Sequence, residues 1–164
     1  MIYGSEKIIE EGQVYNFELR AIDPYDPFRG KYIILNPKET FHRDYLAPCK
    51  NCRMYATFTT NSEGLAEIKT LSPYMPQKND YLIVESISIT TERNGQSGTT
   101  ISYPFDKYYM NEEKVKPAEN LLLKAQRDTS LVPYAQVAIL DGEAQVLRVN
   151  IGDENIIEIV EKNE

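Results

Sequence analysis

Residues 21–36 are Ala-Ile-Asp-Pro-Tyr-Asp-Pro-Phe-Arg-Gly-Lys-Tyr-Ile-Ile-Leu-Asn, and the architecture of the chain is organised around them. Each Asp-Pro step favours extended or turn backbone, because a proline restricts the residue before it. Gly30 is expected to supply the φ freedom needed to leave a tight corner. The run 32–35 is apolar at every position, which is typical of a buried strand. The stretch therefore predicts a strand, a rigid acidic corner, and a core strand over 31–36 that ends before Pro37.

Strand patterns continue on both sides of this corner. Over 14–22 the residues alternate, with Tyr15, Phe17, Leu19 and Ala21 on one face. Three hairpins are predicted, pairing 53–60 with 65–71, 81–90 with 99–103, and 134–140 with 143–151. Asp141-Gly142 joins the last pair and is the strongest turn signal in the chain. Segments 5–12 and 156–160 are expected to add an edge strand and a last strand.

Helical spacing occurs in one region. Val115, Ala118, Leu121, Leu122 and Ala125 fall on one side of a helix. We place Pro117 at the first helical position, where its missing N–H costs nothing, and expect Asn111 to cap a separate short turn. The prediction is a β-rich, antiparallel α+β fold, a sheet or a barrel-like domain, with one main helix near 117–127.

Length and charge limit the classes of function. A chain of 164 residues with 41% hydrophobic content suits one core, so we predict a lead-in over 1–12 and a single domain over 13–164. The formal charge of -7 argues against nucleic-acid binding, which needs a clustered basic surface. No apolar run reaches the roughly 18 residues that cross a bilayer.

Carboxylates occur in suggestive groups. Asp23 and Asp26 share the corner, Glu112 and Glu113 are adjacent before the predicted helix, and Glu119 lies within it. Neighbouring carboxyl groups can be divided between acid and base roles, although Asp before Pro and Glu after Asn are more often structural. Arg29 either locks the corner through bidentate pairing or presents its guanidinium outward.

The only histidine and both cysteines lie in one irregular segment. Cys49 and Cys52 form a C-x-x-C pair, and His42 is the third candidate ligand for a metal. Zinc, thiol exchange, a local disulfide and two free thiols are the interpretations, of which the last two are favoured. We expect no cofactor, because phosphate-binding loops are missing, and no nucleophile elbow is present.

Tyrosines are abundant, with twelve in the chain and no tryptophan. Tyr103, Phe105, Tyr108 and Tyr109 precede the helix. Because tyrosine combines an apolar ring with a hydroxyl group, these residues indicate a recognition surface for protein or sugar. The alternative is a set of rings that closes the end of a barrel-like core.

The corner and its strand resemble the signature of the GDYXXLXY proteins. That signature runs Asp-Pro, a few residues, Arg-Gly-Asp-Tyr, two residues, Leu, one residue and Tyr. The matching positions here are Asp23, Pro24, Arg29, Gly30, Tyr32 and Leu35. Lys31 replaces the acid and Pro37 the last tyrosine, which favours a motif kept for folding. The stretch from Tyr108 through Glu112 to Glu119 is similar to a second pattern of the family.

This resemblance implies a bacterial protein that is tethered by an N-terminal hydrophobic anchor upstream of the domain and lies outside the cytoplasm. It also implies that a neighbouring gene frequently encodes a multi-spanning membrane protein. We therefore expect a non-enzymatic domain that binds or supports a membrane-protein partner. Its candidate surface comprises Asp23, Asp26, Arg29, Gly30, Tyr32, Tyr108, Tyr109, Glu112 and Glu119. The alternative is a carboxylate-based hydrolase or a carbohydrate-binding domain, with a small molecule or glycan as its ligand.

Overall fold

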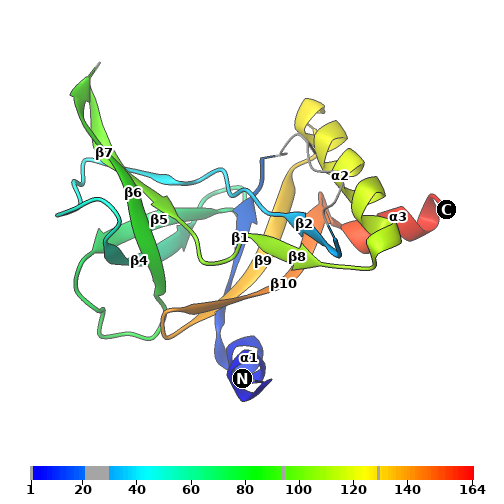
Figure 1. The fold of residues 1–164 in the computed structure, drawn as a ribbon, viewed down its shortest axis with the longest axis horizontal. Coiled ribbons are helices and arrows are strands. Elements are labelled where there is room, and N and C mark those ends of the chain that lie inside the picture. Colours follow the sequence, from blue (N-terminus) through cyan, green and yellow to red (C-terminus); the bar gives the residue numbers. More distant parts are fainter. Residues whose placement is uncertain (1, 21–29, 94, 129) are drawn as a thin grey trace. The chain divides into compact units, whose positions relative to one another are not determined.

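The computed structural model describes residues 2–20, 30–93, 95–128 and 130–164. These residues form three helices and eleven strands, labelled in chain order in Figure 1. Strand makes up 47% and helix 21%, so the chain is β-rich. The sheets are antiparallel. The predicted fold class, a β-rich α+β chain with a main helix near 117–127, is confirmed.

The chain divides into two compact units, and each is described by itself. The first unit consists of residues 1–15, 39–104 and 138–145, and the second of residues 16–38, 105–137 and 146–164. This division does not decide whether residues 13–164 fold as one domain after a lead-in over 1–12, which stays a prediction.

A five-stranded sheet dominates the first unit. Its order is β3 (Phe41–Arg43), β7 (Gln96–Ser102), β6 (Leu82–Arg93), β4 (Arg53–Thr60) and β5 (Ala66–Ser72). Both predicted hairpins in this region are present, and alternation buries one face of the sheet. The buried side chains on these strands include Met54, Ala56, Leu82, Val84 and Ile101. In Figure 1 the β6–β7 pair is the long green hairpin.

Residues 5–12 do not form the predicted edge strand. They belong to helix α1 (Ile2–Glu11), in which Ile8 is buried and Ile9 is exposed. The segment is mostly charged and has one buried apolar residue, Ile8, which is the pattern of a helix that packs along a narrow stripe. Apolar and polar residues do not alternate here, as they would in a half-buried strand. The amide of Gly12 bonds to the carbonyl oxygen of Ile8 at 2.9 Å and ends the helix.

A four-stranded sheet has the order β1 (Gln13–Glu18), β9 (Pro133–Leu140), β10 (Glu143–Ile151) and β11 (Glu154–Asn155). Asp141 and Gly142 join β9 to β10 with φ values of 49° and 87°. Two successive left-handed residues are what a two-residue hairpin turn requires, so the Asp-Gly prediction is confirmed. On β1 the predicted inward residues Tyr15 and Phe17 are buried.

The second unit contains a two-stranded sheet and two helices. The sheet pairs β2 (Tyr32–Ile34) with β8 (Lys107–Tyr109), and the helices are α2 (Glu112–Arg127) and α3 (Ile156–Lys162). Helix α2 contacts both β2 and α3. The rings of Phe17 and Phe105 meet in the core with centroids 5.1 Å apart.

Strand β2 is shorter than the predicted strand over 31–36 and is not buried on both faces. Ile33 and Leu35 are buried, whereas Tyr32 and Ile34 are half-buried. The reason is that β2 pairs only with β8, in a two-stranded sheet, so its second face is not covered as a central strand would be.

Helix α2 begins at Glu112, five residues before the predicted start. Asn111 caps this helix itself, its side chain accepting from the amide of Glu113, and Pro117 lies inside the helix. A proline at this position removes one ladder hydrogen bond near the N-terminus. Burial of Val115, Ala118 and Leu122 along one face offsets that loss.

Residues 156–160 form helix α3 instead of the predicted strand. Ile156 and Val160 are buried four positions apart, and the side chain of Asn155 accepts from the amide of Ile157 at 2.9 Å. The cap and the spacing of the two buried residues favour a helix over the strand propensity of isoleucine and valine.

Candidate functional site

Strands β2 and β8 bring together two sequence stretches singled out as candidate surface. Tyr32 pairs with Tyr109, Ile33 with Tyr108, and Ile34 with Lys107. The two stretches are therefore neighbours across an antiparallel ladder, where opposite side chains on one face interact directly.

One face of this ladder carries Tyr32, Ile34, Lys107 and Tyr109, which we call the tyrosine ribbon. The rings of Tyr32 and Tyr109 meet edge to face, with centroids 5.6 Å apart. The Lys107 ammonium lies 4.8 Å from the centroid of the Tyr32 ring, within cation–π range. Tyr109 is 68% exposed, so aromatic and cationic groups are presented to solvent together.

Lys107 was missed by the sequence analysis. Its signal is alternation, because residues 107 and 109 of a strand share a face while residue 108 points to the other. Only the pairing with β2 shows that this face also holds Tyr32, and that register could not be read from either stretch alone.

Tyr108 does not belong to the ribbon, although it was predicted to share one surface with Tyr32 and Tyr109. It lies on the opposite face of the ladder, beside the buried Ile33, and is half-buried. Burial raises the pKa of the Tyr108 phenol above its usual value, and the nearby Arg148 guanidinium opposes that shift.

The acidic corner lies largely outside the described residues. Asp23, Asp26 and Arg29 fall in the stretch 21–29, so their predicted roles stay predictions. Gly30 is described and lies in the open, with no atom within 4 Å of an added Cβ. Its expected role in leaving the corner depends on residues 21–29 and stays a prediction.

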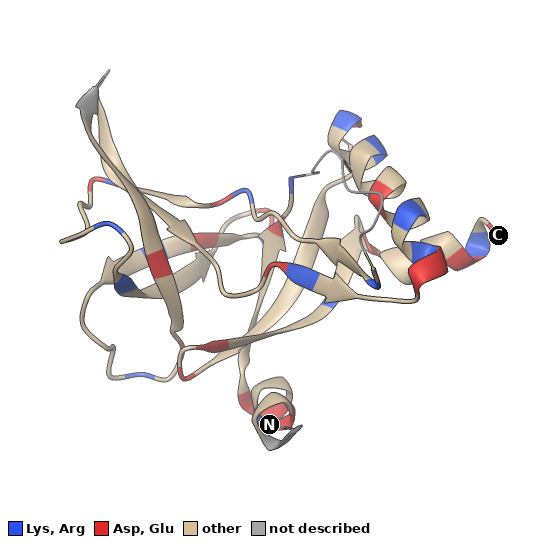
Figure 2. Ribbon diagram, viewed as in Figure 1, with Lys and Arg blue, Asp and Glu red and all other residues tan. Residues whose placement is uncertain are grey.

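Glu112 and Glu119 both lie on α2, where Figure 2 shows acidic and basic residues interspersed. Glu112 is exposed in the first turn, and Glu119 is half-buried. Their Cα atoms are about 10.5 Å apart along the axis, since seven residues rise 1.5 Å each. With Glu112 exposed on the first turn and Glu119 two turns further along, the two residues do not form the enclosed carboxyl pair of a glycoside hydrolase.

Cys49 and Cys52 form a disulfide, which corresponds to the local staple that was one of the favoured interpretations. Neither sulfur is then available as the thiolate that zinc binds. Within the described part of the chain, no group of three or more His, Cys, Asp or Glu side chains is arranged to hold a metal ion. His42 lies on β3, where burial lowers the pKa of its imidazole.

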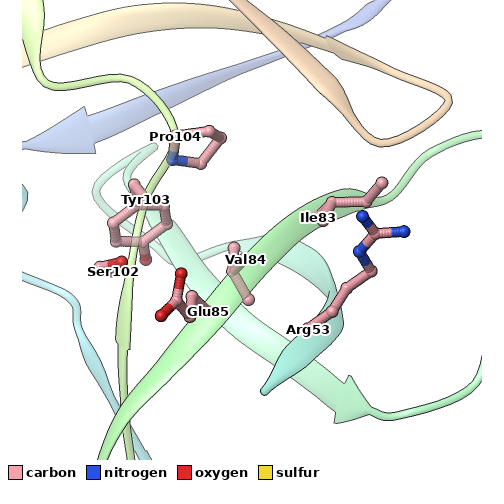
Figure 3. A pocket seen from close by; sticks show the side chains of 7 residues that line it. All are labelled: Arg53, Ile83, Val84, Glu85, Ser102, Tyr103 and Pro104. Carbon is pink, nitrogen blue, oxygen red and sulfur yellow. The ribbon is translucent and has the colours of Figure 1, made fainter. Parts of the chain in front are cut away.

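A groove of about 400 Å³ lies in the first unit, lined by residues of β4, β6 and β7 together with Tyr103 and Pro104. Arg53 pairs with Glu85 and Glu85 with Ser102, which places these three residues in one cross-strand row. In Figure 3 the Arg53 guanidinium lies beside Ile83, while the Glu85 carboxylate points toward Tyr103. The sequence analysis missed this row, because each member looks like an ordinary exposed strand residue.

The groove has room for a small ligand. A guanidinium and a carboxylate in one row can bind groups of opposite charge on the same molecule. The described side chains that line it include one carboxylate and no imidazole. They therefore do not assemble the acid and base pair that hydrolysis by two carboxylates needs.

A family model, described as GDYXXLXY protein, matches residues 1–149 of the chain. The chain belongs to the GDYXXLXY family. No curated protein and no solved structure matches it. No helix among the described residues is both long and apolar enough to cross a membrane.

The GDYXXLXY motif itself has both core and surface positions. Leu35 is buried, and Tyr32 contributes to the exposed ribbon. Pro37, which stands at the position of the motif's last tyrosine, forms a bridge with Leu19. The carbonyl oxygen of Lys31 accepts from the Met110 amide at 2.8 Å, so the motif is bonded to the residue that follows β8.

Proposed function

We propose that this chain is a non-enzymatic, extracytoplasmic domain tethered to a bacterial membrane, which binds a membrane-protein partner through the tyrosine ribbon. The observation that carries the proposal is the exposed packing of Tyr109 against Tyr32, beneath the Lys107 ammonium. Tyrosine is enriched among residues that dominate binding energy, because its ring is large and loses little conformational entropy.

The location is supported by the disulfide and by the family. Disulfides persist in oxidising compartments and are rare in the cytosol, so the Cys49–Cys52 bond fits a domain outside the cytoplasm. The anchor and the membrane-protein partner are what the resemblance to GDYXXLXY proteins implies.

The ribbon restricts the chemistry of the partner. Two aromatic rings present apolar area, and Lys107 provides an exposed cation. A complementary segment would place an apolar side chain against Tyr109 and a carboxylate or carbonyl oxygen near the ammonium.

The proposal is tested by affinity purification of the full-length protein from detergent-solubilised membranes of its host. We expect Tyr109→Ala to reduce retention of a specific membrane protein by about tenfold or more, as for a residue that dominates an interface. Leu131→Ala, an exposed apolar residue in the same unit, is the matched control and should leave retention unchanged.

Leu131→Ala should unfold near the wild-type temperature, and Tyr109→Ala, which loses the ring contact with Tyr32, should stay folded with an unfolding temperature only slightly lowered. A partner retained equally by Tyr109→Ala and the wild type would exclude the ribbon as the binding surface. Turnover of a glycan or peptide panel by the purified protein, lost on substitution of Glu112 or Glu85 by Gln, would contradict the non-enzymatic assignment.

A further inference from the structure

The disulfide between Cys49 and Cys52 closes a very small ring. Only two residues separate the cysteines, and the bond lies in the loop 44–52 that joins β3 to β4. In the chain-entropy account, a disulfide stabilises a fold more when it closes a longer loop, so a ring of this size contributes least. Stabilisation of the fold is therefore a weak reason for this bond.

Hydrogen bonds that do not involve sulfur hold the first half of the loop. The Thr99 hydroxyl donates to the carbonyl oxygen of Tyr45 at 2.8 Å and accepts from the Ala47 amide at 2.9 Å. The Asp44 amide donates to the carbonyl oxygen of Ser97 at 2.9 Å. Both Ser97 and Thr99 lie on β7, and Thr99 is fully buried. The loop is thus attached to β7 by contacts that do not depend on the disulfide.

Ser86, which is fully buried on β6, holds the backbone of both cysteines. Its hydroxyl donates to the carbonyl oxygen of Cys49 at 2.7 Å and accepts from the Cys52 amide at 3.0 Å. Its own amide donates to the carbonyl oxygen of Cys52 at 3.0 Å, and its carbonyl oxygen accepts from the Asn51 amide at 2.6 Å. The Cα atoms of the cysteines are 5.7 Å apart, a usual separation for a disulfide. Because Ser86 fixes this arrangement through the backbone, the dithiol and the disulfide can share it.

The two cysteines differ in exposure. Cys49 is exposed, as are Lys50 and Asn51, whereas Cys52 is half-buried. Access helps to decide which sulfur an external thiolate attacks, and exposed disulfides are reduced more readily than buried structural ones. Cys49 is therefore the residue that meets an external thiol, and Cys52 is the leaving group.

We infer that Cys49 and Cys52 form a reversible redox site that a dithiol oxidoreductase reduces. A thiolate of the reductant attacks Cys49 Sγ, the S–S bond breaks, and Cys52 leaves as a thiolate that takes a proton from water. The reductant's second thiolate then attacks the reductant's own sulfur in the mixed disulfide, and Cys49 is released and protonated. The chain gains two electrons and two protons, and the reductant becomes a disulfide. The site belongs to the first unit, so the inference does not depend on partner binding by the tyrosine ribbon.

Trapping the mixed disulfide tests the assignment of Cys49. The wild-type chain is mixed, without denaturant, with a thioredoxin variant that keeps only its attacking cysteine, and the reaction is quenched with iodoacetamide. Trypsin cleaves after Arg43, Lys50 and Arg53, so the two cysteines fall in separate peptides, 44–50 and 51–53. We expect thioredoxin on peptide 44–50 and the alkyl group on peptide 51–53. The reverse assignment, or no mixed disulfide, would overturn the inference.

A glutathione titration without denaturant tests whether the two redox states share one fold. The chain has two cysteines, so alkylation followed by mass spectrometry reports this pair alone. We expect the disulfide to be reduced while the far-ultraviolet circular dichroism stays unchanged. A bond that glutathione reduces only in denaturant, as is typical of a structural disulfide, would overturn the inference, as would unfolding of the chain on reduction.

Ser86→Ala tests the backbone scaffold in the same titration. The variant should raise the ratio of dithiol to disulfide about threefold or more, because the thiols are held together less firmly once these hydrogen bonds are lost. Ser88→Ala, at an exposed position of the same strand, is the matched control and should leave the ratio unchanged. Equal ratios for a folded Ser86→Ala variant and the wild type would overturn the scaffold on which the inference rests.

Discussion

Ser86 shows how one buried hydroxyl holds the disulfide loop in place. It is fully buried on β6, and it satisfies backbone groups of both cysteines in the disulfide loop. Ser86→Ala leaves the Cys49 carbonyl oxygen and the Cys52 amide, both in part-buried hydrogen bonds, without this partner. We expect the free energy of unfolding to fall by about 1–3 kcal/mol, measured by urea titration. Ser88→Ala, on the exposed part of the same strand, should change it by less than about 0.5 kcal/mol.

Glu39 links stability to pH. Burial raises the pKa of its carboxyl above the usual 4.5, and the charge of Glu67 raises it further. The folded state therefore binds this proton more tightly than the unfolded state, and the stability it contributes at low pH is lost as the pH rises through the folded pKa.

Glu39→Gln removes that dependence. At pH 7 the variant should be more stable than the wild type, by a margin reduced by the partial exposure of the carboxyl. The difference should shrink as the pH falls and vanish well below the usual pKa of 4.5, where the carboxyl is protonated in both the folded and the unfolded wild type. Glu63→Gln, at an exposed position, is the control. A stability difference between Glu39→Gln and the wild type that widens as the pH falls would contradict this prediction.

Gly142 in the β9–β10 turn tests whether close packing adds to backbone strain in fixing a turn. Gly142 has φ +87°, and a Cβ there would lie 2.7 Å from the Cδ1 atom of Ile83. Gly64 has φ +81° and open space around it. Alanine at position 64 should cost about 1 kcal/mol of backbone strain, and alanine at position 142 about 2–4 kcal/mol because side-chain overlap is added. Thermal unfolding of the two variants measures the difference, and equal losses would exclude the packing contribution.

Most strands could be predicted from the sequence, because alternation and turn residues are local signals. Asp141-Gly142 specifies its hairpin through two left-handed residues, and the alternation of Tyr15 with Phe17 marks the buried face of β1. Helix α3 was not predictable in this way. Its short apolar run suits a strand or a helix equally, and the burial of Ile156 and Val160 was decided by packing elsewhere in the chain.

The candidate site was predictable in composition and not in arrangement. Tyr32 and Tyr109 stood out as members of two suggestive stretches, but their pairing depends on a register between distant segments. Alternation within β8 already separates Tyr108 from Lys107 and Tyr109. Only the register shows that Tyr32 lies on the face of Lys107 and Tyr109, because periodicity assigns faces within a strand and not between strands.

For the whole molecule, the tyrosine ribbon and the groove beside Arg53 and Glu85 belong to different compact units. The ribbon is made by residues of the second unit, and the groove by residues of the first. Substitutions at Tyr109 and at Glu85 should therefore have additive effects on the free energy of unfolding, measured by urea titration of the two single variants and the double variant.

Photo-cross-linking in cells addresses partner binding by the ribbon most directly. A photoreactive phenylalanine analogue replaces Tyr109 in the full-length protein, and the same analogue replaces Leu131 in a control. We predict that irradiation links position 109 to one membrane protein and that position 131 gives no such product. The same product from both positions, or none from position 109 in a folded and membrane-associated protein, would contradict the assignment of the tyrosine ribbon as a partner-binding surface.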